Sequence, residues 1–411
     1  MELKKYKLAD IADFNKSSIS RSETFKEIIY LDTSSITENV VSGTAIINIK
    51  EAPSRAQRKV TNNTIIYSTV RPRLKHYGIL SRPQNNFIVS TGFATIDIKD
   101  SYKYKIDPRY LYLLLTQQTI TNYIGNIADT AVSAYPSINP SDLSSLCFMF
   151  PDYDIQKTIA DIWNNYDCKI AFNRAINQNL EAMAKQLYDY WFVQFDFPNE
   201  EGKPYKSSGG DMVWNEKLKR EIPKDWEVLP LFDAVNVQYG FPFATEQFTE
   251  EETNVPVVRI RDILEGTTSA YSLEKANEKY HLNENDVLVG MDGNFHMNFW
   301  HDNIAYLNQR CVRLRAHSDS TISSIQILHS IKPYIKAKEQ NAKGSTVGHL
   351  SDKDLKGLYL IKPLKTRTFN PRKALDGLLA LVIENKKQIL SLTKQRDELL
   401  PLLINGQITI E

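Results

Sequence analysis

The chain has 411 residues, of which 42% are hydrophobic and 24% are charged. This length is too great for one ordinary core and suits two or three domains, and the composition is that of a soluble globular protein. Its 50 Lys and Arg against 49 Asp and Glu give a net charge of +1. That balance excludes a strongly basic chain that coats nucleic acid and an acidic disordered chain, but it does not exclude a local DNA-binding patch.

The three cysteines, Cys147, Cys168 and Cys311, are widely separated and odd in number. They form no CxxC or Cys/His cluster, so neither a structural zinc site nor a disulfide framework is predicted. The first residues show no signal-peptide pattern, and the apolar runs are far shorter than the ~20 residues of a membrane span. We therefore expect a soluble, cytoplasmic protein.

Short segments rich in β-branched and aromatic residues predict strands in both halves of the chain. Longer segments with apolar residues at helical spacing predict helices that follow them. The predicted strands cover residues 28–31, 65–70, 87–98, 255–260, 286–289 and 310–314, and the predicted helices cover residues 110–121 and 323–337. Each half therefore contains a mixed α/β region, and the predicted fold class is α+β.

Residues 52–96 contain no Asp or Glu, although the whole chain is balanced in charge. Such a stretch predicts a local positive field of the kind that neutralises DNA phosphates. Pro72 stiffens a segment that follows a predicted strand, and Arg is the usual bidentate partner of guanine. The alternative is an ordinary solvated basic loop. The candidate DNA-binding residues in this copy are Arg55, Arg58, Lys59, Arg71, Arg73, Lys75 and His76.

Two long segments, residues 155–190 and 375–403, carry mostly apolar residues at alternating steps of three and four. A period of about 3.5 residues predicts two helices that pair in a coiled coil, rather than helices buried against a sheet. Asn173 and Asn385 fall on the two predicted seams at corresponding positions. We predict that they lie buried against each other and fix the register of the helices. The alternative is that both lie at the solvated edge.

The chain also repeats itself. The segment from Ile138 to Pro151 matches the segment from Leu350 to Pro363, and the same offset aligns the two long helical segments. Between the copies, residues 198–225 are rich in turn formers and charge, which predicts a linker. We therefore predict two copies of one unit, each a mixed region followed by a long helix.

In the second copy, Arg259 and Arg261 are predicted to alternate on one strand face, and residues 290–298 form a loop in the place of residues 71–76. Asn can read adenine bidentately, and His can bind a phosphate or a base edge. Because Asp292 lies nearby, an ordinary loop is the alternative. The candidate DNA-binding residues in this copy are Arg259, Arg261, Asn294, His296, Asn298, Arg310, Lys343 and His349.

Sequence motifs for catalysis are absent. There is no phosphate-binding glycine loop, HExxH or GxSxG. Asn139-Pro140 and Asn370-Pro371 are not followed by the second Pro and the aromatic residue with which amino-methyltransferases hold a flipped base. We therefore predict no catalytic residue and no metal site in this chain.

Three short segments resemble the central region of the specificity subunits of type I restriction-modification systems. They are Phe192-Val-Gln-Phe195-Asp-Phe197-Pro198, Gly202-Lys-Pro204 and Ile222-Pro223-Lys-Asp-Trp226. The segment from Arg396 to Gly406 is similar to the distal region of that family, with Asn405 where Ser is usual. The resemblance covers essentially the whole chain.

The resemblance implies two target recognition domains, residues 1–150 and 226–363, separated by two long antiparallel coiled-coil helices. These helices belong to a central region, residues 151–197, and a distal region, residues 364–411, with the linker at 198–225. It also implies a non-catalytic subunit that reads a bipartite site in double-stranded DNA, with one domain for each half-site and the helices as a ruler.

Two methylation subunits, which bind S-adenosylmethionine, and two restriction subunits, which use ATP and Mg²⁺, are the implied partners, and this chain itself is expected to bind no cofactor. Two alternatives stay open. One is the specificity subunit of a related methylation-only defence system, and the other is a coiled-coil protein scaffold.

Overall fold

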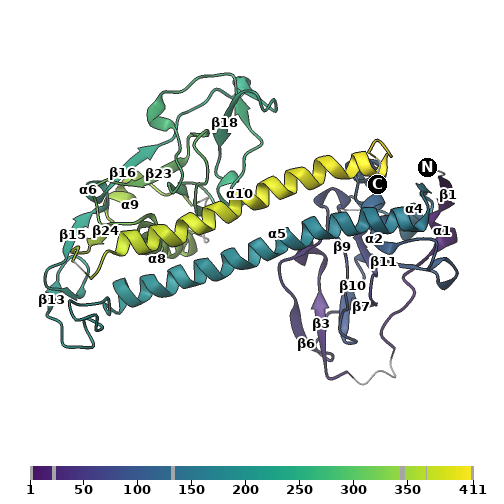
Figure 1. Cartoon of the computed structure of the whole chain (residues 1–411), viewed down its shortest axis with the longest axis horizontal. Helices are drawn as coiled ribbons and strands as arrows, with labels where there is room; N and C mark the ends of the chain where they lie inside the picture. Colours follow the sequence, from purple (N-terminus) through teal and green to yellow (C-terminus); the bar gives the residue numbers. More distant parts are fainter. Residues whose placement is uncertain (1–2, 21–24, 131–134, 343–347, 367, 409–411) are drawn as a thin grey trace. The chain divides into compact units, whose positions relative to one another are not determined.

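The computed structural model in Figure 1 describes residues 3–20, 25–130, 135–342, 348–366 and 368–408. The chain forms two compact units. Unit 1 consists of Met1–Cys168 with Lys394–Glu411, and unit 2 consists of Lys169–Thr393. Two long helices, α5 (Tyr153–Tyr188) and α10 (Pro371–Ile404), each contribute one end to each unit. None of the described helices combines the length and the apolar character that a membrane span requires.

Each unit contains a four-stranded antiparallel sheet with the same strand order. In unit 1 the sheet consists of β2 (Ala12–Phe14), β11 (Phe93–Ile98), β8 (Ile65–Ser68) and β9 (Tyr77–Ile79). In unit 2 it consists of β16 (Val235–Tyr239), β23 (Cys311–Ala316), β20 (Val287–Gly290) and β21 (Met297–Phe299). The repeat predicted from the sequence is therefore confirmed at the level of topology.

A second four-stranded sheet in each unit includes one parallel pair. In unit 1 it consists of β6 (Ala45–Asn48), β3 (Glu27–Leu31), β10 (Phe87–Ser90) and β7 (Ala56–Lys59), with β3 and β10 parallel. In unit 2 it consists of β17 (Phe248–Thr249), β19 (Tyr271–Ser272), β18 (Val255–Val258) and β22 (Tyr306–Leu307), with β18 and β22 parallel.

Shorter elements complete the two units. Unit 1 has the strand pairs β1 (Lys4–Lys7) with β12 (Cys147–Phe150) and β4 (Ile36–Thr37) with β5 (Val40–Val41), and the helices α1 (Leu8–Ile11), α2 (Pro108–Leu115), α3 (Gln118–Asp129) and α4 (Pro140–Ser144). Unit 2 has the pair β15 (Glu227–Pro230) with β24 (Tyr359–Lys362) and the helices α6 (Leu231–Ala234), α7 (Asp262–Glu265), α8 (Ser324–Ala342) and α9 (Asp352–Lys356). The predicted strands and helices lie within or beside these elements.

The ends of the long helices are part of the core of each unit. In unit 1, Trp163 of α5 and Leu403 of α10 are buried in one apolar cluster with the side chains of α2. In unit 2, Tyr188 of α5 and Leu375 of α10 are buried with the strands of the antiparallel sheet. Within each unit the start of one helix meets the end of the other, as an antiparallel pair requires. The prediction that these helices are not buried against a sheet was wrong at their ends, because the apolar residues there face strands as well as the other helix.

The buried line of α5 differs from the predicted seam by one residue. It runs through Gln156, Trp163, Ile170, Asn177 and Ala184, which are seven residues apart. The predicted seam took the residue before each of these five positions, including Met183, whose exposed fraction is 53%. The reason is that two residues on the buried line are polar, so a search for apolar residues passes over them.

The predicted pairing of Asn173 with Asn385 was wrong. Asn173 is only half buried, and its Nδ2 donates to Oε1 of Gln388 at 3.3 Å. The buried asparagine of α5 is Asn177, whose Nδ2 donates to the backbone oxygen of Val382 at 3.1 Å. Asn177 is therefore the candidate for fixing the register of the helices, and the part that Asn173 and Asn385 play stays a prediction.

The predicted linker is a folded part of unit 2. Residues 198–225 include a β-hairpin of β13 (Met212–Asn215) and β14 (Arg220–Pro223). Tyr205 stacks on Phe197 with ring centroids 4.7 Å apart, and Phe197 stacks on Trp226 at 4.6 Å. The linker was predicted from the turn-forming residues of this segment. Its few aromatic and aliphatic residues nevertheless pack against the core of unit 2.

Candidate DNA interface

The same loop is built at the same place in both units. In unit 1 it connects β8 to β9, and in unit 2 it connects β20 to β21. Four backbone hydrogen bonds hold it in unit 1: Ser68 N to His76 O at 2.9 Å, Thr69 N to Gly92 O at 2.8 Å, Ile138 N to Thr69 O at 2.9 Å and Arg71 N to Pro136 O at 2.8 Å. Their counterparts in unit 2 are Gly290 N to His296 O at 2.8 Å, Met291 N to Arg310 O at 2.8 Å, Leu350 N to Met291 O at 2.7 Å and Gly293 N to Gly348 O at 3.0 Å. We call these two segments, residues 69–76 and 291–296, the matched loops.

One backbone conformation recurs in the matched loops. Arg71 has a φ of 48° and Gly293 a φ of 68°, both in the left-handed region. Glycine adopts this conformation without steric cost, whereas a residue with a Cβ is strained there. The two loops therefore share these backbone hydrogen bonds and one turn conformation but present different side chains, as the sequence predicted for this place. The loop of unit 1 adds a 3-10 turn at Pro72–Leu74.

Carboxylates from outside residues 52–96 neutralise several cations of that stretch. Arg55 pairs with Asp32 at 2.8 Å, Arg73 with Asp129 at 2.8 Å, and Lys75 with Glu38 at 2.6 Å. The expectation of an uncompensated positive field is therefore corrected. An acid-free stretch of sequence does not remain acid-free once the chain folds, because its neighbours in space come from residues 32, 38 and 129.

Three further candidates of unit 1 lie outside these three ion pairs. Arg58 and Lys59, both half buried, lie on β7, and Arg58 donates to Oγ of Ser18 at 3.5 Å. The ring of His76 is held by its Nδ1, which donates to the backbone oxygen of Ile36 at 2.6 Å. Only its other ring nitrogen is then left for a ligand.

Arg71 is an exposed cation of the matched loop in unit 1 and, unlike Arg73 and Lys75, has no ion pair among the described residues. Its guanidinium lies over the ring of Tyr135, 4.6 Å from the ring centroid. Tyr135 is 57% exposed and directly precedes Pro136, whose backbone oxygen accepts from Arg71 N. Sequence reasoning did not select Tyr135, and the available signal was its position next to Pro136, just before the segment that repeats.

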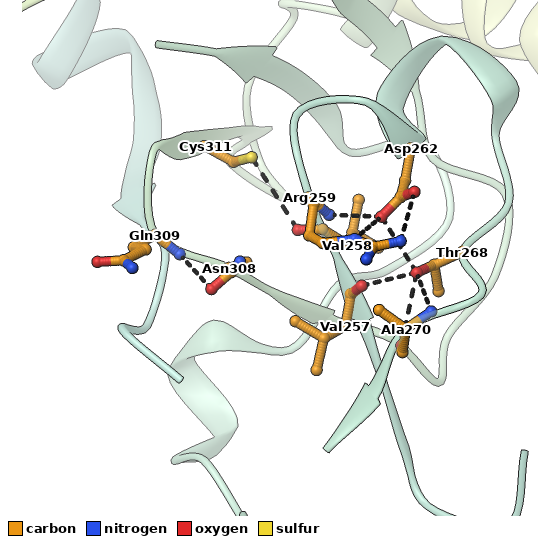
Figure 2. A network of polar contacts seen from close by, with 9 residues as sticks. All are labelled: Val257, Val258, Arg259, Asp262, Thr268, Ala270, Asn308, Gln309 and Cys311. Atoms are coloured by element: carbon orange, nitrogen blue, oxygen red, sulfur yellow. Dashed lines mark hydrogen bonds and ion pairs between the residues drawn. The ribbon is translucent and has the colours of Figure 1, made fainter. Parts of the chain in front are cut away.

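Arg259 and Arg261 do not alternate on a strand. β18 ends at Val258, and Arg259 instead donates from Nε to Asp262 at 2.8 Å and from Nη2 to the same carboxylate at 3.1 Å. Figure 2 shows Arg259 and Asp262 pointing toward each other, with Thr268 bonded to the same carboxylate at 3.1 Å. Arg259 thus stabilises the turn into α7, while Arg261 is exposed at the start of that helix.

The candidates in the second matched loop have different environments. Asn294 is exposed and His296 is half buried. Asn298 lies on β21, where its Nδ2 donates to the backbone oxygen of Ile263 at 3.0 Å and its Oδ1 accepts from Lys386 at 3.1 Å. The side chain of Asn298 is therefore occupied within unit 2. Asn294 is the asparagine that the loop presents to solvent.

Asp292 connects the matched loop of unit 2 to two other candidates. Its carboxylate pairs with Arg310 at 2.6 Å and with Nδ1 of His349 at 2.5 Å. Burial acts to raise the pKa of Asp292, but the hydrogen bonds from His349 and Arg310 outweigh it and lower that pKa. Arg310 and His349 are thus held at the loop by a carboxylate whose charged form these bonds favour. The remaining candidate, Lys343, lies outside the described residues.

Comparison with known families decides what these two units are. A family model described as the type I restriction modification DNA specificity domain matches residues 1–182 and residues 223–391. The chain belongs to this family. Each match includes one matched loop, so the specificity-domain family accounts for both copies of the repeat.

Several specificity subunits are similar to the chain over most of its length. The MjaIX specificity subunit of Methanocaldococcus jannaschii is 27% identical over 87% of this chain and 83% of its own length. The HindI specificity subunit of Haemophilus influenzae is 24% identical over 98% of this chain and 99% of its own length. A solved S subunit from M. genitalium shares the fold, with a TM-score of 0.54 at 16% identity over 98% of this chain and 96% of that one.

Proposed function

We propose that this chain is the DNA specificity subunit of a type I restriction-modification complex and reads a bipartite target with one unit for each half-site. The observation that carries the proposal is the pair of matched loops. Family membership supplies the class of function, and the loops supply a way to read two different sequences. A common backbone with different side chains is what two dissimilar half-sites would require.

Affinity and sequence choice would come from different contacts. Lys and Arg near the loops contact phosphates and set the position of the duplex, but phosphates carry no sequence information. Side chains that reach base edges in the major groove supply the choice, and one good bidentate contact contributes about 1–3 kcal/mol of discrimination. Arg71 and Asn294, which are exposed polar residues of the matched loops without an ion pair among the described residues, are the best placed for that part.

Methyl transfer and DNA cleavage would then belong to partner subunits. The curated relatives carry the name of specificity subunits, and the sequence of this chain contains none of the catalytic motifs that were sought. We infer that methylation subunits hold S-adenosylmethionine and that restriction subunits use ATP and Mg²⁺. Two copies of each would match the two units, and this chain would itself need no cofactor.

Salt dependence of duplex binding tests the proposal against a protein scaffold. The full chain, alone and with its cognate methylation subunit, is titrated against labelled duplex DNA between about 50 and 200 mM salt. Over this range a protein that makes several phosphate contacts loses about three orders of magnitude in affinity. We expect the logarithm of the binding constant to fall linearly with the logarithm of salt concentration. A scaffold would show no duplex binding, and binding that does not depend on salt would contradict the proposal.

A further inference from the structure

The left-handed turn of unit 1 holds a side chain where the fold accepts glycine. Gly293 of unit 2 occupies the corresponding place, with the same backbone hydrogen bond and a φ of 68°. Arg71 adopts a φ of 48° at that place in unit 1. A residue with a Cβ is strained in this conformation, and such strain is found at functional sites. Other non-glycine residues, including Lys75 and Arg82, also adopt it, so the role of Arg71 follows from its contacts.

The three cations of the matched loop in unit 1 differ in what they contact. Arg73 is bonded to Asp129 at 2.8 Å and to Asn126 at 2.7 Å, and Lys75 is bonded to Glu38 at 2.6 Å. For Arg71, the described residues provide no carboxylate partner and no side-chain hydrogen bond. Within the described residues the guanidinium of Arg71 contacts the face of Tyr135, so its N–H donors are available for a ligand.

Stacking on Tyr135 prepares Arg71 for a planar ligand. An aromatic ring beneath a guanidinium fixes its plane through cation–π attraction and leaves its N–H edge unused. Holding the plane in advance reduces the side-chain entropy that binding would otherwise cost. On the major-groove edge of guanine, O6 and N7 are both acceptors, so two N–H groups of one guanidinium can bond to them together. Adenine has the donor N6 in the place of O6.

We propose that Arg71 reads one guanine of the first half-site and that Tyr135 is the positioning residue that holds Arg71 for this contact. This inference rests on the function proposed above and adds the base and the pair of residues that select it. At the same place in unit 2, Gly293 offers no side chain, so the second half-site is read through other residues of that loop.

The test uses the methylation complex that contains this chain. The bipartite motif of the wild-type complex is determined first, by sequencing modified adenines. Methylation rates are then measured on duplexes in which each base pair of the first half-site is replaced in turn. Without a defined wild-type motif the proposed function fails. With a wild-type motif, the variants below test this inference separately.

We expect Arg71→Lys and Tyr135→Ala to reduce discrimination at the same single G·C pair, roughly tenfold to a hundredfold for Arg71→Lys and less for Tyr135→Ala. Tyr135→Phe, which keeps the ring, should retain the preference. Arg82→Ala is the matched control, since Arg82 is an exposed arginine of the same acid-free stretch outside the matched loop. It should leave the motif unchanged.

The inference is overturned if Arg71→Lys keeps full discrimination at every position. It is also overturned if Tyr135→Ala affects a different base pair from Arg71→Lys, or if Tyr135→Phe loses as much discrimination as Tyr135→Ala. Thermal unfolding of each variant identifies a general loss of folding, and preserved recognition of the second half-site in the same reaction shows that the complex is intact.

Discussion

Single residues give the two units their different chemistry, while several backbone hydrogen bonds of the matched loops are the same. Arg71 and Gly293 share one turn conformation, and His76 and His296 accept the same backbone hydrogen bond. On this shared set of bonds, unit 1 presents the guanidinium of Arg71 stacked on the ring of Tyr135. Unit 2 presents Asn294, and the neighbouring Asp292 pairs with Arg310 and His349. Substitution at such positions could change a half-site without altering the fold.

At the same scale, the capping box of α9 makes a pH prediction. The Asp354 carboxylate accepts from Ser351 N at 2.8 Å and from Ser351 Oγ at 2.6 Å, and it pairs with Lys338. Burial acts to raise the pKa of Asp354, but the bonds from Lys338 and Ser351 lower it to about 2. Its contribution to stability is therefore complete above its ordinary pKa of 3.8 and is lost as the pH falls toward 2.

We expect Asp354→Asn to lower the free energy of unfolding of unit 2 at pH 7 by about 1 kcal/mol, the usual contribution of a helix cap. Denaturant unfolding followed by tryptophan fluorescence measures this. Asp142→Asn is the matched control, because Asp142 caps α4 in the same way but without a lysine partner in the described chain. A difference between Asp354→Asn and wild type that grows as the pH falls below 3.8 would contradict the assignment.

Residue types were easier to predict than residue contacts. The basic stretch and the two loops were identified from the sequence, and the structure confirms that the loops correspond. The ion pairs of Arg55, Arg73 and Lys75 were not predictable, because their carboxylates are distant in sequence and no local pattern connects them. Tyr135 was missed for the same reason.

Among the elements, the long helices show how a polar residue can occupy a buried line. Asn177 is buried, its Nδ2 is bonded to the oxygen of Val382, and its Oδ1 has no hydrogen-bond partner in the described structure. A buried acceptor without a partner costs about 1–3 kcal/mol, and a single buried asparagine in a helix pair commonly fixes its register at this expense.

We therefore expect Asn177→Leu to raise the free energy of unfolding of unit 2 by about 1 kcal/mol, since it removes the unpaired oxygen and adds apolar contact. Urea unfolding of the full chain measures the change. Asn173→Leu, at a half-exposed position of the same helix, is the control and should change stability by less than about 0.5 kcal/mol. If Asn177→Leu destabilises the chain while the control does not, the bond to Val382 matters more than the unpaired oxygen.

Strands and helices were predicted well where the pattern was strong, and poorly where few residues decided the outcome. The strands from Glu27 to Leu31 and from Phe93 to Ile98 follow β-branched runs that any propensity scale would select. The hairpin at 212–223 depends on packing of Phe197 and Ile222 into unit 2, which composition alone does not reveal.

For the whole molecule, the repeat is the feature with the most consequence. Both units carry an antiparallel sheet of the same strand order, a second sheet with one parallel pair, and one end of each long helix. The sequence predicted the repeat but assigned the long helices to regions of their own. That assignment followed the family resemblance and the heptad spacing, and in the structure Trp163 and Leu403 lie in the core of unit 1.

The most direct measurement is the sequence context of methylated adenines in cells that co-express this chain with its cognate methylation subunit. Single-molecule sequencing would record the motif with and without the chain. We predict one motif of two short defined segments, separated by a fixed number of unspecified base pairs, that appears only when the chain is present. An unchanged methylation pattern in its absence, or a single continuous motif in its presence, would contradict the account.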